Sequence, residues 1–189
     1  MILSKQYLDA EVRNRNLYNN FAYGGLFYNK RQELAQYDIF ISYSWNDRSY
    51  ADRVVQLLEK CGYTVYIDYN DNRLDRDNVS EETARRIISE MKKCKGLLHL
   101  YSPNSSVSKW CPWEVGVFSG IKSFRCANLP LTENRGDDFK KQEYLEIYPY
   151  IEYEKASGTT KYEFWVCESK NKYIELKYWL DGYEPCIHS

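Results

Sequence analysis

The sequence predicts an α/β fold built on a parallel sheet, and two observations carry this prediction. Short apolar runs rich in Ile, Val, Leu, Phe and Tyr are typical of strands that are buried on both faces of a sheet. Between these runs lie segments of roughly 10 to 15 residues with the apolar periodicity of amphipathic helices. Strands that alternate with such helices form βαβ units, in which neighbouring strands run parallel.

Four strands are expected in chain order, each as a short apolar run. They cover residues 38–44 (DIFISYS), 63–68 (YTVYID), 96–102 (GLLHLYS) and 126–131 (CANLPL).

Three helices are expected between and after these strands. Residues 48–62 place apolar side chains on one face and end at Gly62, a residue that commonly stops helices. Ser80 is a good N-cap for a helix over residues 81–94, whose acidic start and basic end suit the helix dipole. Pro112 is tolerated only in the first turn of a helix, so a third helix is expected to begin near residues 109–111.

The regions on either side of this core differ from it in composition and in their apolar pattern. Residues 1–36 are polar and are expected to form an N-terminal extension of one or two helices. Residues 37–189 are expected to form the main domain, with a core over 37–131 and a C-terminal elaboration over 132–189. The alternating pattern in this elaboration predicts a terminal hairpin, or a strand and a short helix, at the sheet edge.

Composition excludes several classes of function. The chain has 189 residues and a formal net charge of −1, so it lacks the clustered basic surface that nucleic-acid binding requires. No stretch approaches the roughly 20 apolar residues of a membrane-spanning helix, and we expect no membrane association and a cytoplasmic location. Six cysteines without a CxxC pair and only two histidines predict reduced thiols and no metal site.

Ligands of open parallel sheets bind at the carboxyl ends of the strands, and polar residues gather there in this sequence. Ser44 and Trp45 lie at the end of the first strand, Asp68 ends the second, and residues 102–104 lie at the end of the third. Neither a GxGxxG nor a GxxxxGK[ST] motif is present, so the chain has no Rossmann fingerprint and no P-loop. Trp45 could line a ligand or simply pack in its loop, and Asp68 could shape a pocket or cap the loop that follows.

Trp110 and Glu114 lie four positions apart at the start of the third expected helix. A carboxylate near a helix N-terminus is favoured in its ionised form by the helix dipole. On spacing alone Glu114 could be a charged group of a ligand site, or it could only cap its helix while Trp110 packs beside it.

The segments DIFISYSWND, GYTVYID and YSPNSSVSKWCPWE occur in this order, and together they resemble a Toll/interleukin-1 receptor (TIR) domain over about residues 37–131. The resemblance implies a flavodoxin-like fold with about five parallel strands and helices on both faces. It also implies one of two activities, homotypic docking in immune signalling or cleavage of NAD⁺. The N-terminal extension and the C-terminal tail look like those of stand-alone bacterial TIR proteins, including those of antiphage systems.

In the NAD⁺-cleaving members the glutamate of the Trp-xxx-Glu motif is catalytic, and by resemblance that residue is Glu114. Nicotinamide leaves NAD⁺ as a neutral ring, so one fixed carboxylate that stabilises the oxocarbenium-like ribose is sufficient. The resemblance places Ser44, Trp45, Asp68 and Trp110 in the substrate pocket, although Trp45 stands where some relatives carry a basic residue. NAD⁺ is then the substrate, and no separate cofactor or metal is expected.

Residues 69–79 correspond to the loop through which TIR domains contact one another, with Asn72, Arg73, Leu74 and Arg76 as its assembly residues. The resemblance thus implies self-association, and a diffusible product implies a separate effector protein. The alternative reading is a non-catalytic TIR module that acts only by assembly. A flavodoxin-like or nucleoside-transferase relative that shares the sheet but not the chemistry is a third possibility.

Overall fold

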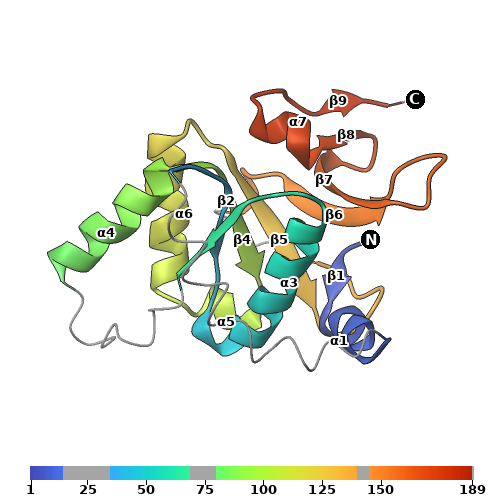
Figure 1. Ribbon diagram of the computed structural model, residues 1–189, viewed down its shortest axis with the longest axis horizontal. Helices are drawn as coiled ribbons and strands as arrows, with labels where there is room; N and C mark the ends of the chain where they lie inside the picture. The colour runs from blue at the N-terminus through green and yellow to red at the C-terminus, as the bar shows by residue number, and fades with distance from the viewer. Residues whose placement is uncertain (15–34, 69–79, 140–144, 189) are drawn as a thin grey trace.

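The computed structural model describes residues 1–14, 35–68, 80–139 and 145–188. Within these ranges the strands form one mixed sheet of nine, in the order β3-β2-β4-β5-β6-β7-β8-β9, with β1 paired to β5. Helices cover both faces of the sheet (Figure 1). The predicted α/β class is therefore confirmed.

The predicted parallel part of the sheet is present and has five strands. In spatial order they are β3 (Val65–Ile67), β2 (Tyr37–Ser42), β4 (Cys94–Tyr101), β5 (Cys126–Thr132) and β6 (Tyr150–Lys155). Each pairs in parallel with its neighbour along this order. The first four coincide with the four expected runs, although β3 is shorter than the expected range of 63–68.

The C-terminal elaboration extends the sheet with antiparallel strands. They are β7 (Tyr162–Ser169), β8 (Lys172–Glu175) and β9 (Cys186–Ile187), with the short helix α7 (Leu176–Leu180) between β8 and β9. β6 pairs with β7 and β7 with β8, both antiparallel. The expected hairpin and short helix at the sheet edge are thus both found.

Helices pack on the two faces of the sheet as the apolar periodicity requires. On one face lies α3 (Arg48–Lys60), on the other α4 (Glu81–Lys92) and α6 (Trp110–Ile121), as Figure 1 shows. We call the side covered by α4 and α6 the α6 face. The side chain of Ser80 accepts a hydrogen bond from the Thr83 amide at 3.2 Å, so the expected N-cap of α4 is confirmed.

The N-terminal segment contains an element that the sequence analysis missed. β1 (Leu3–Ser4) pairs in parallel with the end of β5 and leads into α1 (Lys5–Asn14). Only helices were predicted for residues 1–36, since a strand of two residues leaves no periodic pattern. Leu3 and Leu8 are buried in the same core as α3, while the division of the chain at residue 36 stays a prediction.

The sheet separates two apolar clusters, which follow the alternation of side chains along its strands. Ile39, Ile41, Leu98 and Leu100 point towards α3, α1 and α7. Phe40, Leu97 and Cys126 point to the α6 face, where they meet α4 and α6; Phe118 supplies the largest side chain from these helices. Polar residues that alternate in step with Phe40 and Leu97 along these strands therefore point to the α6 face.

Gly96 of β4 packs closely against α7. A Cβ atom there would lie 2.5 Å from Leu180 Cδ2 and 3.2 Å from Trp179 Cζ3, and both of these side chains are buried. We expect Gly96→Ala to lower the free energy of unfolding by about 1–3 kcal/mol, because these packed side chains must move aside. Urea unfolding measures this change.

Gly120→Ala is the matched control for Gly96→Ala. Gly120 lies in the exposed part of α6, and an added Cβ would contact nothing within 4 Å. Alanine favours a helix over glycine, so this variant should be slightly more stable than the parent. Equal stability of the two variants would contradict the close packing of α7.

Two further observations concern the cysteines and the helices of the described residues. All six cysteines are free, and four of them are buried. No helix in the part of the chain that the structure describes is long and apolar enough to cross a bilayer.

Candidate active site

The carboxyl ends of β2, β3 and β4 meet at one edge of the sheet because these strands are parallel neighbours. The chain leaves β2 through a short 3₁₀ turn (Trp45–Asp47) and leaves β4 through α5 (Pro103–Ser106). α6 then starts at Trp110, so its first turns follow directly from this edge. Five of the residues singled out from the sequence lie at this edge or in α6: Ser44 and Trp45 after β2, Asp68 after β3, and Trp110 and Glu114 in α6.

Glu114 is joined to the sheet by a hydrogen bond. The Ser42 hydroxyl, at the end of β2, donates to Glu114 Oε2 at 2.6 Å. Glu114 is half-buried in the second turn of α6, and Ser42 is 1% exposed. The Ser42 hydroxyl restricts the rotation of the Glu114 carboxyl group. The site therefore holds this acidic group in a fixed position at the carboxyl edge, through a contact that helix capping does not require.

The start of α6 is set by Ser108 and Pro112. Ser108 Oγ accepts hydrogen bonds from the amides of Trp110 and Cys111, both at 3.3 Å, and Pro112 lies in the first turn as predicted. The half-buried Trp110 ring meets Trp113 edge-to-face, with centroids 5.1 Å apart. These contacts fix the helix entrance from which Glu114 projects.

Ser44 and Trp45 lie in the turn after β2. Ser44 is buried, and its carbonyl accepts a hydrogen bond from the Asp47 amide at 2.8 Å. The Trp45 ring is half-buried, and the Arg48 guanidinium lies over it, 4.5 Å from the centroid. Trp45 thus packs against a cation and keeps part of its surface open to a ligand.

Asp68 ends the extended segment that follows β3 and is buried. Its Oδ2 accepts a hydrogen bond from Arg86 Nη2 of α4 at 2.7 Å, and its backbone carbonyl accepts one from the Tyr43 hydroxyl at 3.1 Å. The sequence analysis offered two roles for Asp68, shaping a pocket or capping the loop that follows. Neither of them included this ion pair. Arg86 was missed because it lies 18 positions from Asp68 in the chain.

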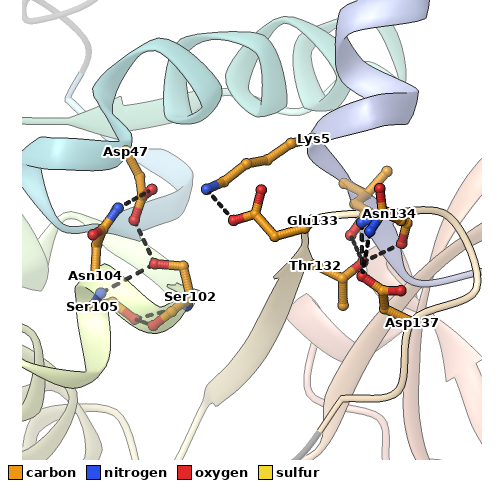
Figure 2. A network of polar contacts seen from close by, with 10 residues as sticks. Lys5, Asp47, Ser102, Asn104, Ser105, Thr132, Glu133, Asn134 and Asp137 are labelled. Atoms are coloured by element: carbon orange, nitrogen blue, oxygen red, sulfur yellow. Dashed lines mark hydrogen bonds and ion pairs between the residues drawn. The ribbon is translucent and has the colours of Figure 1, made fainter.

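Asp47 connects the loops after β2 and β4. Its carboxylate accepts hydrogen bonds from the Ser102 hydroxyl and, at 2.8 Å, from the Asn104 amide nitrogen (Figure 2). Ser102 and Ser105 also cap α5 reciprocally. Asp47 is 1% exposed, so this buried charge is compensated by neutral donors. The turn that carries Trp45 is thereby held against α5.

A second group of polar contacts ties the N-terminal segment to the same edge, with Lys5 and Glu133 in the middle of Figure 2. Lys5 Nζ donates to Glu133 Oε1 at 2.5 Å, just after β5. Burial by itself lowers the pKa of Lys5, but the bond to Glu133 outweighs it and the pKa is raised. The Lys5 amine stays charged and also lies in the field of Asp47.

His99 lies on the α6 face of β4, in register with Ser42 on one side and Asn128 on the other. It is 2% exposed, and this burial lowers the pKa of the imidazole to about 4; a hydrogen bond to the Ser42 backbone acts in the opposite direction. The imidazole is therefore neutral at pH 7.

This lowered pKa predicts a pH-dependent stability. Between pH 6.5 and 4 the unfolded chain binds a proton at His99 and the folded chain does not. The corresponding stability is complete above pH 6.5 and is lost as the pH falls towards 4, by about 3 kcal/mol in total. Urea unfolding at pH 7 and 4.5 should show this loss in the parent and a smaller one in His99→Gln. Identical losses in both proteins would contradict it.

Sequence reasoning had no signal for the Ser42 contact. Ser42 was read as part of a buried strand, and Ser44 was chosen instead because it follows the strand end. The parity of β2 could have identified it, since Ser42 shares a face with Phe40. The predicted assembly residues Asn72, Arg73, Leu74 and Arg76 lie outside the described residues.

Within the described ranges, no three His, Cys, Asp or Glu side chains gather as metal ligands.

Comparisons with known proteins agree with the fold. A family model described as "TIR domain" matches residues 39–158, a range that contains each of the predicted site residues. "Probable 3' cyclic ADP-D-ribose synthase ThsB'" of Bacillus cereus (strain MSX-D12) is 40% identical over 146 residues, 76% of this chain and 75% of that protein. "Putative cyclic ADP-D-ribose synthase TIR2" of Cytobacillus dafuensis is 28% identical over 104 residues, 53% of this chain and 27% of that protein. The chain belongs to the TIR domain family.

Proposed function

We propose that this protein cleaves the N-glycosidic bond between nicotinamide and ribose in NAD⁺ and forms a cyclic ADP-ribose. The observation that carries the proposal is the Glu114 carboxylate, held by Ser42 at 2.6 Å at the carboxyl edge of the sheet. Ligands of this type of sheet bind at that edge. Two relatives named as cyclic ADP-D-ribose synthases support the cyclic product.

The main contribution that the reaction needs from the protein is electrostatic stabilisation of a positive charge. When the glycosidic bond breaks, its electron pair goes to the pyridinium nitrogen, and nicotinamide leaves as a neutral molecule. The positive charge passes to the ribose, where the Glu114 carboxylate stabilises it. A hydroxyl group of the same ADP-ribose then attacks the cation and loses its proton, which closes the ring. Attack by water instead gives linear ADP-ribose.

The remaining predicted site residues act in binding. The Trp45 and Trp110 rings offer partly open aromatic faces for the planar groups of NAD⁺. Ser44 and the buried Asp68 shape the edge between β2 and β3. Cyclisation needs a site that excludes water, because water competes with the internal hydroxyl for the cation.

Purified protein incubated with NAD⁺ tests the proposal directly. Mass spectrometry should show nicotinamide together with a product lighter than ADP-ribose by one water. ADP-ribose alone would make the protein a hydrolase. If no nicotinamide formed at any protein concentration, the proposal would be wrong. The alternative function, a non-catalytic TIR module that acts by assembly, would then be favoured.

Self-association is part of the proposal. By resemblance, residues 69–79 contact a neighbouring TIR domain and complete its site, so specific activity should rise with protein concentration. Reversing the charge of Arg73 and Arg76 together should lower association and activity and change stability by less than about 0.5 kcal/mol. Light scattering and initial rates measure both properties. Constant specific activity in a monomeric sample would refute this part.

Catalysis without a metal is proposed as well, since a neutral leaving group needs no Lewis acid. Unchanged rates in EDTA would agree with catalysis without a metal. Loss of activity in EDTA and its return with zinc or magnesium would contradict it.

We propose that the product acts on a separate effector protein, in a bacterial antiphage response like that of the stand-alone TIR proteins this chain resembles.

A further inference from the structure

The substrate of the proposed reaction carries a negatively charged diphosphate, and the sheet edge where it binds is rich in carboxyl groups. Glu114, Asp68 and Asp47 all lie there. Carboxylates repel a diphosphate unless a cation compensates its charge. Arginine is well suited to this task, because its planar guanidinium matches the geometry of a phosphate group.

Arg86 of α4 places its guanidinium at this edge. Its Nη2 donates a hydrogen bond to Asp68 Oδ2 at 2.7 Å. The two side chains differ in exposure, since that of Asp68 is 9% exposed and that of Arg86 is 38% exposed. The carboxylate therefore lies inside and fixes the guanidinium, while the guanidinium keeps a surface on which an anion can bind.

Asp68 lies beside Ser42, the residue that contacts Glu114. Phe40 of β2 and Tyr66 of β3 are direct cross-strand partners, and both belong to the core on the α6 face. Ser42 and Asp68 follow two positions later in the two segments, so they lie at the same level and point to the same face. Neighbouring strands are about 4.8 Å apart. The contact of Asp68 with α4, which covers this face, agrees with the assignment.

The acidic and the basic group are therefore held at neighbouring strand ends. Ser42 bonds to Glu114 at 2.6 Å, and Asp68 bonds to Arg86 at 2.7 Å. In NAD⁺ only a few covalent bonds separate the reacting ribose carbon from the nearer phosphate. A ribose that faces Glu114 can thus place this phosphate against Arg86.

The opposite direction along the edge is unfavourable for the diphosphate. There the Asp47 carboxylate joins the loops after β2 and β4, and it accepts hydrogen bonds from the neutral side chains of Ser102 and Asn104. The Lys5 amine on that side bonds to Glu133 at 2.5 Å, so its charge is already paired. The charges around the site thus direct the diphosphate towards β3 and α4.

We propose that Arg86 binds the diphosphate of NAD⁺ and that Asp68 is the positioning residue that holds its guanidinium at the carboxyl edge. The inference deepens the proposed function and rests on it for the identity of the substrate. The diphosphate takes no part in bond cleavage and is the same in the substrate and in the transition state. Loss of this contact should therefore raise KM and leave kcat nearly unchanged.

Kinetics of charge-removing and charge-keeping variants test this role. Arg86→Gln should raise KM for NAD⁺ about tenfold, as expected for one lost hydrogen bond to a charged group, with kcat within about twofold. Arg86→Lys keeps the charge and should restore most of the loss. Nicotinamide riboside has the same glycosidic bond but no phosphate, so the parent and Arg86→Gln should cleave it with equal kcat/KM. An unchanged KM for NAD⁺ in Arg86→Gln, or an equal loss with nicotinamide riboside, would overturn the inference.

Arg85→Gln is the matched control. Arg85 is the neighbour of Arg86 in α4 and pairs with Glu81 on the exposed surface of the helix. Its substitution removes the same charge from the same helix and should leave KM for NAD⁺ unchanged. If Arg85→Gln raised KM as much as Arg86→Gln, the effect would come from the general charge of α4, and a specific contact of Arg86 would be refuted.

Binding of ADP-ribose provides a readout that does not depend on catalysis. Titration calorimetry should show about tenfold weaker binding to Arg86→Gln than to the parent and to Arg85→Gln. Equal affinities, or no binding to the parent, would overturn the inference. If the parent released no nicotinamide from NAD⁺, the proposed function would be wrong, but this comparison would still decide the role of Arg86. Should Arg86→Gln not fold because the buried Asp68 loses its partner, the double variant Asp68→Asn/Arg86→Gln removes both charges and takes its place in both experiments.

Discussion

Glu114→Gln should fold normally and lose NAD⁺ cleavage by a factor of about 10² to 10⁴. The amide has nearly the shape of the carboxylate, and its oxygen can still accept the hydrogen bond from Ser42. What disappears is the negative charge opposite the ribose cation, and with it most of the transition-state stabilisation. Initial rates of nicotinamide release measure the effect.

The matched control is Glu82→Gln, in the exposed first turn of α4. It removes the same charge from a site with no role in the reaction, so turnover should stay unchanged. Thermal unfolding should show that both variants are folded. A folded Glu114→Gln protein with more than half of the parent turnover would refute the assignment.

Asp47→Ala should cost about 3 kcal/mol of stability, the largest stability effect expected near the site. The substitution leaves the Ser102 hydroxyl and the Asn104 amide without their buried acceptor. Activity should fall as well, because the turn that carries Trp45 is no longer tied to α5. Urea unfolding and initial rates measure the two effects.

Asn46→Ala, on the exposed neighbour of Asp47, is the control and should change stability by less than about 0.5 kcal/mol. If Asp47→Ala were as stable as this control, the connection between the two loops would contribute nothing to the fold.

The parallel core was predictable because each of its elements has a local signal. Apolar runs marked β2, β4 and β5, Ser80 marked the start of α4, and Pro112 marked the start of α6. β1 could not be predicted in this way, because two residues carry no periodicity. Its place depends on the edge that β5 offers at Leu131 and Thr132.

The candidate site was predictable in its residues but not in its contacts. Glu114 and Trp110 were found from their spacing and from the resemblance to TIR domains. Ser42 was not found, because it lies 72 positions from Glu114 and looks like an ordinary strand residue. The same holds for the bond between Arg86 and Asp68, which depends on the packing of α4 against the sheet.

The pairing of β1 with β5 has a consequence for the order of folding. Thr132 bonds to the Leu3 carbonyl, 129 positions away in the chain, so β1 has no partner until β5 has been synthesised. Closing so long a loop costs entropy that local contacts do not repay, and such contacts form late. During that interval the core that buries Leu8 of α1 is incomplete. The nascent chain therefore passes through a stage in which its central strands can assemble while an apolar helix surface is exposed to chaperones or to other chains.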